Sequence, residues 1–587
     1  MAYFLKKSNL KKGVYLQIYE SFYNRDKKET AHKSYMALGY VQDLIDAGIP
    51  DPIAYYSDVV KQMNIDAKRI KEESKARQIA ASPERHLGYF LLQNIYKSLH
   101  VSNYLDLMQS VRDFRFKLSD LMEALIYSRV VDPRSKSRTC HDILPKLYES
   151  YGLTYDQILD GVEYMGHEYE KIIEIFNHQV NLKYPLDAST TYFDCTNFYF
   201  EIDKEDEFRR KGPSKENRHD PIIGLGLLLD ANQVPIGMKL YPGNESEKPV
   251  IRQVIKELKE RNQISGRTVQ VADKGLNCAN NIISALKNKD GYLFSKSVKQ
   301  LPETEKTWVL LKNDYKKITD SNGTLLYEIK ECIDEFPYTY TDENGKKHTV
   351  RLKEKRVVTY NPKLAEKKKY EINRMVEKAK MLKASQAKKS EFGECSKYVT
   401  FGCADPKGNA IDGKVRVTIN REAIDRDLEL AGYNLLVTSE TKMKADNIYN
   451  TYHNLWRIEE SFKVMKSYLD ARPVYLQKTA SIHGHFLVCY LSVLLIRLLK
   501  FKVLKNKYCT ERLINFIREF RVVELEQDKY VNITASSDFI KSLAAEQGLP
   551  ITNYFLNESQ IKKDAKAQVL SFSTIFFIFI PKDRYYI

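Results

Sequence analysis

Two aspartates stand inside strand-like runs whose other residues would fill a hydrophobic core. Asp194 lies within residues 190–200 (TTYFDCTNFYF), and Asp273 ends residues 269–273 (VQVAD), just before a turn. An isolated carboxylate is costly to bury, so each must meet a cation or a metal ion. The ends of strands are also where α/β proteins commonly place catalytic groups. For either aspartate taken alone, a structural residue at a strand end is the alternative interpretation.

A third acid, Glu459, lies in a segment with helical spacing. Tyr452, Glu459 and Lys466 are seven residues apart, which is nearly two helical turns, so their side chains form one stripe. Lys463 lies four residues after Glu459 and joins that stripe. A tyrosine, an acid and two lysines in line suit a surface that binds metal ions and phosphate. The alternative is an amphipathic helix with an ordinary surface pair between Glu459 and Lys463.

The elements that must position these acids follow a recognisable order. Residues 190–200, 222–229 and 234–240 have the composition of three strands, and helices and strands then alternate. Three early strands followed by alternating helix and strand is the order of a ribonuclease-H-like fold, which is an α/β fold. The later elements are expected to be a helix at 250–259, a strand at 268–272, a helix at 279–286 and a strand at 291–295.

The segment between the second and third acids changes in character. Asn322-Gly323 and Asn344-Gly345 are hairpin signals between β-branched and aromatic runs, which predict a β-rich insertion. Within it, residues 364–389 hold nine Lys or Arg against three Glu with helical spacing, which fits either a phosphate-facing helix or a solvated one. A strand at 433–438, a long helical stretch at 445–468 and a largely buried helix at 482–502 are expected to follow.

The two ends of the chain are less distinctive. Residues 83–178 have a helical pattern with basic loops such as Arg134–Arg138, which fits a helix-turn-helix-like DNA reader or a helical packing domain. Residues 1–70 hold short apolar alternations and then a helical pattern near residues 40–47. Residues 570–580 form a strand-like run rich in Phe and Ile that would promote aggregation if left unpaired.

Length and charge set the class of protein. A chain of 587 residues predicts three or four structural units. Its 93 Lys and Arg against 77 Asp and Glu leave a net charge of +16, which suits nucleic acid as a partner, with a merely soluble basic protein as the alternative. The longest apolar runs, 486–496 and 569–580, are short of the roughly 20 residues that a membrane helix needs. Eight cysteines without a C-x-x-C pair, and no visible signal peptide, predict a cytoplasmic protein without membrane association.

The segment 452–466 resembles the YREK signature of insertion-sequence DDE transposases of the insertion-sequence-four-like group. The spacing matches at Tyr452, Glu459 and Lys466, whereas the arginine of the signature falls on Leu455 and Arg457 is the candidate to replace it. The resemblance covers about residues 185–500. It includes the residues around both aspartates and the runs GLGLLLD at 224–230 and YPGNES at 241–246.

This resemblance implies that Asp194, Asp273 and Glu459 form a DDE triad that holds two divalent ions. Mg²⁺ is expected because hard cations prefer oxygen ligands, with Mn²⁺ as a substitute. One ion would activate water or a DNA 3′-hydroxyl, and the other would stabilise the leaving oxygen. The residues expected to bind DNA are Tyr452, Arg457, Lys463 and Lys466.

The implied fold is a ribonuclease-H-like catalytic core interrupted by a β-rich insertion and preceded by a mostly helical DNA-binding region. The implied partners are DNA, as terminal inverted repeats and target, and a second copy of the chain in a synaptic dimer in the bacterial cytoplasm. A DNA-binding protein without catalysis, and a nuclease that cannot join strands, are the alternatives. The expected divisions are an N-terminal region (1–184), two parts of the core (185–300 and 426–505), the insertion (301–425) and a C-terminal region (506–587).

Overall fold

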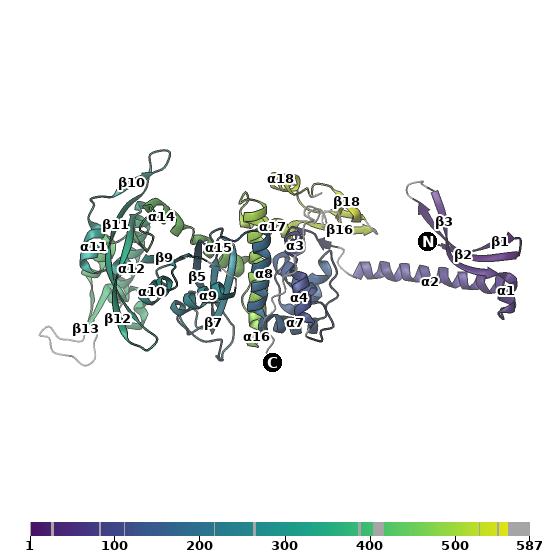
Figure 1. The fold of residues 1–587 in the computed structure, drawn as a ribbon, viewed down its shortest axis with the longest axis horizontal. Helices are drawn as coiled ribbons and strands as arrows, with labels where there is room; N and C mark the ends of the chain where they lie inside the picture. The colour runs from purple at the N-terminus through teal and green to yellow at the C-terminus, as the bar shows by residue number, and fades with distance from the viewer. Residues whose placement is uncertain are drawn as a thin grey trace. The chain divides into compact units, whose positions relative to one another are not determined.

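The computed structural model divides the chain into two compact units. The N-terminal unit consists of residues 1–85, 522–533 and 554–558, and the main unit holds the rest, including every predicted site residue. The first boundary between these two units follows Arg85, and Figure 1 shows the elements of both units. The division expected after residue 184 stays a prediction. The strand-like run at 570–580 lies outside the described residues. The structure describes residues 2–24, 29–80, 84–110, 112–216, 218–261, 266–385, 389–402, 416–526, 529–548 and 551–561.

The N-terminal unit begins with three antiparallel strands, in the segment where the sequence has short apolar alternations. Alternating aromatic and β-branched residues favour strands there, and Leu16 and Ile18 are buried. The strands are β1 (Ala2–Leu10), β2 (Gly13–Asn24) and β3 (Glu29–Tyr40). Helices α1 (Val41–Asp46) and α2 (Pro52–Ala80) follow. A second sheet contains β4 (Glu84–His86), β16 (Arg521–Glu526), β17 (Lys529–Asn532) and β18 (Phe555–Asn557).

The main unit is built on a nine-stranded sheet in the order β10-β11-β12-β15-β9-β8-β5-β6-β7. The first three strands along the chain, β5, β6 and β7, pair antiparallel, and β8 and β9 run parallel to β5. This is the order of strands that the sequence predicts. These strands are β5 (Thr190–Tyr199), β6 (Ile222–Leu229), β7 (Pro235–Pro242), β8 (Val269–Ala272) and β9 (Gly291–Lys296). The connecting helices are α9 (Glu247–Arg261) and α10 (Ala279–Lys287).

The segment expected to form a β-rich insertion continues this same sheet, because β12 pairs with β15 and β15 pairs with β9. Both predicted hairpin turns form, with Gly323 and Gly345 at positive φ. The strands are β10 (Lys316–Thr319), β11 (Leu325–Thr341), β12 (Lys347–Tyr360) and β15 (Tyr433–Thr438). The segment also holds α11 (Glu303–Leu310), α12 (Pro362–Ala384), α13 (Arg421–Glu429) and the small hairpin of β13 (Val399–Gly402) and β14 (Arg416–Ile419).

A helical bundle packs around α16 (Thr479–Arg497), whose side chains are buried except at Thr479, Ala480 and His483. Helix α5 (Leu118–Val131) is buried at every position but Asp120, so it has no free face to offer a DNA groove and instead fills the core. The other helices are α3 (Phe90–Ser98), α4 (Val101–Gln109), α6 (Lys136–Arg138), α7 (Tyr155–His167), α8 (Tyr169–Lys183), α17 (Thr510–Glu519) and α18 (Asp538–Gln547). No helix among the described residues is both long and apolar enough to span a membrane.

The helical stretch predicted for residues 445–468 forms, but a tight turn at Asn454 and Leu455 divides it. The amides of Leu455 and Ile458 each donate to a carbonyl three residues earlier, at 3.0 Å, where an α-helix would use the fourth. The turn lets Leu455 bury its side chain. The segment is therefore α14 (Ala445–His453), α15 (Trp456–Lys463) and the short π-helix η5 (Val464–Tyr468).

Candidate active site

Asp194 and Asp273 are neighbours on adjacent parallel strands. Phe193 of β5 pairs with Ala272 of β8, so the next residue on each strand is an aspartate. Phe193 and Ala272 both lie in the core that packs against α9 and α10. Because side chains alternate along a strand, the two aspartates point to the opposite face, with their backbones about 4.8 Å apart. Strand order and register thus bring together two acids that are far apart in the sequence.

The environment of Asp194 disfavours its charge. Burial raises the pKa of the Asp194 carboxyl to about 7, opposed by Lys215 and the Cys195 amide and reinforced by Asp273 and Glu247. The Lys215 Nζ is 3.9 Å from Asp194 Oδ1. The Cys195 amide donates to Asp194 Oδ1 at 2.7 Å, which fixes the side chain. A half-buried carboxylate held next to another acid is more typical of a functional site than of a structural one.

This raised pKa gives a stability prediction. An Asp194 pKa near 7 in the folded protein, against about 3.9 unfolded, means that folding stability falls as pH rises through that window. We expect Asp194→Asn to stabilise the metal-free protein at pH 8 by on the order of 2 kcal/mol, and to leave it unchanged near pH 4. Thermal melts in EDTA measure this, with the exposed Asp203→Asn as the matched control. A lower melting temperature for Asp194→Asn at pH 8 would contradict the assignment.

Glu459 is presented to the same region by α15, which packs against β5. Its neighbour Ile458 is buried, whereas Glu459 is exposed and forms no hydrogen bond or ion pair with any described residue, Lys463 included. Burial, and to a smaller extent the carboxylates of Asp273, Asp194 and Glu459, raise the pKa of Tyr452 to about 12, although a hydrogen bond with Ser295 opposes them. The charges of all three predicted acids therefore act on the Tyr452 hydroxyl, and we call Asp194, Asp273 and Glu459 the acid site.

The four predicted DNA-binding residues have different surroundings. Tyr452 borders the acid site, and Lys466 binds Glu216 through its Nζ at 3.0 Å from Oε1. Lys463 is exposed, with its Nζ 5.9 Å from the centre of the Tyr468 ring. The guanidinium of Arg457 packs on two aromatic rings, those of Trp456 at 4.7 Å and Phe501 at 5.2 Å. Leu455, which stands at the arginine position of the signature, is buried and supplies no cation.

Glu460 is held in a buried ionic network and so differs sharply from Glu459. Its Oε2 accepts from Arg497 at 2.9 Å, and its Oε1 accepts from Lys500 at 2.9 Å and from the Thr510 hydroxyl at 2.5 Å. Although burial opposes it, these partners lower the pKa of Glu460 to about 2. The network ties α15 to the end of α16, to the π-helix η6 (Leu498–Val503) and to α17. Of the two adjacent glutamates, only Glu459 is free for chemistry.

The donor set of the acid site fits a hard divalent cation, since it consists of three carboxylates. Within the described residues, however, no three His, Cys, Asp or Glu side chains are arranged to hold an ion as they stand. Asp194 and Asp273 each accept a backbone N–H bond, at 2.7 and 2.6 Å, and Lys215 supplies positive charge beside Asp194. Like-charged carboxylates repel, so closing the site around an ion requires the ion's own charge.

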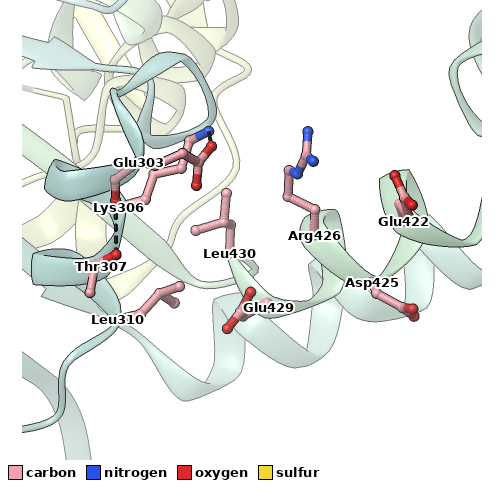
Figure 2. A pocket seen from close by; sticks show the side chains of 9 residues that line it. All are labelled: Glu303, Lys306, Thr307, Leu310, Glu422, Asp425, Arg426, Glu429 and Leu430. Atoms are coloured by element: carbon pink, nitrogen blue, oxygen red, sulfur yellow. Dashed lines mark hydrogen bonds and ion pairs between the residues drawn. The ribbon is translucent and has the colours of Figure 1, made fainter.

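A separate hollow of about 580 Å³ lies between α11 and α13. Figure 2 shows that its walls are mostly charged, and it contains none of the predicted site residues. Lys306 Nζ donates to Glu303 at 2.8 Å across one wall. The hollow is therefore not the acid site. Its charged lining residues are Glu303, Lys306, Glu422, Asp425, Arg426 and Glu429.

Four residues around the acid site are not evident from the sequence. Lys215 and Glu216 lie in the connection between β5 and β6, Glu247 begins α9, and Arg472 follows η5. None repeats with a helical or strand period, because three of them lie in or beside loops. The charged run at 215–218 (KENR) is the only local signal, and it does not reveal which acids or bases it meets.

Comparison with known proteins gives one family match. A family model described as "Transposase DDE domain" matches residues 194–495, which is a little more than half of the chain. The matched segment begins at Asp194 and includes Asp273 and Glu459. A solved structure, the cryo-EM structure of the piggyBac transposase synaptic complex with hairpin DNA, is similar over 73% of this chain and 78% of that chain. Its sequence identity is 11% and its TM-score 0.34. No curated protein matches the sequence.

Proposed function

The chain belongs to the transposase DDE domain family, and we propose that it binds the terminal inverted repeats of an insertion sequence and cleaves and transfers DNA strands. A family of this kind implies a ribonuclease-H-like core and a divalent-metal requirement, and the mixed α/β sheet agrees with that core. The observation that carries the proposal is the side-by-side placement of Asp194 and Asp273, with the helix that carries Glu459 packed against the strand of Asp194.

In this proposal the three acids are the metal ligands. Asp194, Asp273 and Glu459 would hold two ions, Mg²⁺ or Mn²⁺, which when bound activate the attacking hydroxyl and stabilise the leaving oxygen. Tyr452 keeps its proton near neutral pH because its pKa is about 12, so its hydroxyl can donate a hydrogen bond to a DNA phosphate. Lys463 and Lys466 would add positive charge along the same DNA strand.

The finer assignment is to the insertion-sequence-four-like group with the YREK signature. It is supported by the spacing of Tyr452, Glu459 and Lys466. Leu455 stands at the arginine position of the signature, and Arg457 is the proposed substitute for that arginine. The same assignment places the protein in a bacterial cytoplasm and makes the active form a dimer, since two element ends must be held at once. Light scattering of the DNA complex tests the dimer, and a monomeric complex would contradict it.

A strand-joining assay separates this proposal from its two alternatives. Purified protein is incubated with labelled DNA from the ends of the element, a supercoiled target plasmid and Mg²⁺. We expect the labelled 3′ end to become joined to the plasmid. Cutting without joining would indicate a nuclease, and binding without cutting would indicate a DNA-binding protein. Omitting the target plasmid should leave cutting intact and remove the joined product.

A further inference from the structure

The connection between β5 and β6 places two adjacent, oppositely charged residues against the two sides of the site. Lys215 lies beside the acids, with its Nζ 3.9 Å from Asp194 Oδ1 and 3.4 Å from Glu247 Oε1. Glu216 lies beside the bases, in ion pairs with Lys466 and Arg472. Lys215 thus neutralises negative charge that the acids would offer to a metal ion, and Glu216 neutralises positive charge that Lys466 and Arg472 would offer to DNA.

Two cations converge on one carboxylate oxygen of Glu216. Lys466 Nζ lies 3.0 Å from Oε1, and the Arg472 guanidinium contacts the same oxygen. Both cations also rest on aromatic rings at the end of β5, Lys466 at 5.4 Å from the Phe198 centroid and Arg472 at 5.3 Å from that of Tyr199. Although burial opposes it, Arg472 and Lys466 lower the pKa of the Glu216 carboxyl, so it is anionic at neutral pH.

The geometry around Glu216 is that of a phosphate site. A lysine and an arginine held on adjacent rings and aimed at one anionic oxygen would repel each other without an anion between them. The side chains of Lys466 and Arg472 are only 14% and 22% exposed, so their charges are weakly screened by solvent. Lys466 is also one of the residues already assigned to DNA, and it reaches the cluster from the same helical segment as Glu459.

Resting on the proposed function, we propose that Glu216 occupies the place of a DNA backbone phosphate in the free protein, and that Lys466 and Arg472 bind that phosphate once the carboxylate has left. Arg472 thereby becomes a phosphate-binding residue. Because Lys215 and Glu216 are consecutive, withdrawing Glu216 also pulls the Lys215 ammonium from Asp194. DNA binding is thereby coupled to the availability of that carboxylate.

The test is the affinity of variants for a labelled random-sequence duplex, measured by fluorescence anisotropy at fixed salt in EDTA. Removing an internal competitor raises apparent affinity, and we expect Glu216→Gln to bind about tenfold more tightly than wild type. The matched control is Glu201→Gln, which makes the same change of charge in the same connection but at an exposed residue without an ion pair among the described residues. It should alter affinity by less than about twofold.

Two further variants sharpen the test. Arg472→Ala added to Glu216→Gln should cancel the gain, and Glu216→Ala should reproduce it if the amide itself contributes nothing. Equal affinity of wild type and Glu216→Gln, or an equal gain in Glu201→Gln, would overturn the inference. This assay involves no metal and no cutting, so a failure here leaves the proposed function standing. Conversely, absent cleavage of element ends would refute that function without changing these affinities.

Discussion

Replacing Asp194, Asp273 or Glu459 by alanine is expected to reduce Mg²⁺-dependent DNA cleavage by at least about 10³-fold while DNA binding stays within a few-fold of wild type. Each substitution removes one carboxylate from a set of three, and the glutamate adjacent to Glu459 is already engaged. Glu460 is adjacent to Glu459 but is bound to Arg497, Lys500 and Thr510. Single-turnover cleavage of labelled DNA measures the loss.

The control for this prediction is Asp446→Ala, which removes an exposed acid from α14, in the same helical segment, without touching the acid site. Its cleavage rate should match wild type. Comparable cutting by Asp446→Ala and by any of the three alanine variants would show that the acids are not catalytic. Loss of DNA binding in the alanine variants would instead point to a structural role for the residue concerned.

Glu460→Ala is expected to lower the free energy of unfolding of the main unit by about 3–5 kcal/mol, because it leaves buried cations without an anion. Arg497 is fully buried and Lys500 is 5% exposed, and both donate to this one carboxylate. A Glu460 pKa of about 2, below the ordinary value, means that this stabilisation is present at neutral pH and is lost as pH falls from about 4 towards 2. Denaturant or thermal unfolding followed by circular dichroism measures the change.

The adjacent Glu459→Ala is the matched control, since its carboxylate is exposed and forms no ion pair with a described residue. It should unfold like wild type and yet fail to cleave DNA, whereas Glu460→Ala should unfold early. If both variants lose the same stability, the separation of roles between the two glutamates is wrong. If neither does, the buried network contributes less than its contacts suggest.

Much of the core could be predicted because it depends on local periodicity. The runs that form β5, β6 and β8 are short and apolar, and their order determines that Asp194 and Asp273 stand on neighbouring strands. The hairpins at Gly323 and Gly345 were also predictable, since Asn-Gly favours the turn. The roles of the predicted acids still rest on the family and on chemistry, and they stay predictions until variants are measured.

Other features depend on contacts between distant residues and could not be predicted. The turn at Asn454 and Leu455 gains its stability from burial of Leu455, which helical spacing does not reveal. Glu459 and Glu460 look alike in the sequence, and only the position of Arg497 on α16 separates them. Aromatic residues in strands 2–10 and 13–24 indicated β-structure weakly, because short amphipathic alternations of this kind also fit loops.

The most direct test of the acid site is the metal specificity of cleavage by Asp194→Cys. A thiolate is a poor ligand for Mg²⁺ but an acceptable one for Mn²⁺. If Asp194 holds the ion, Asp194→Cys should be inactive in Mg²⁺ and regain measurable cleavage in Mn²⁺, while Asp194→Ala stays inactive in both. Equal cleavage by wild type, Asp194→Cys and Asp194→Ala in Mg²⁺ would contradict a metal-dependent site at this residue.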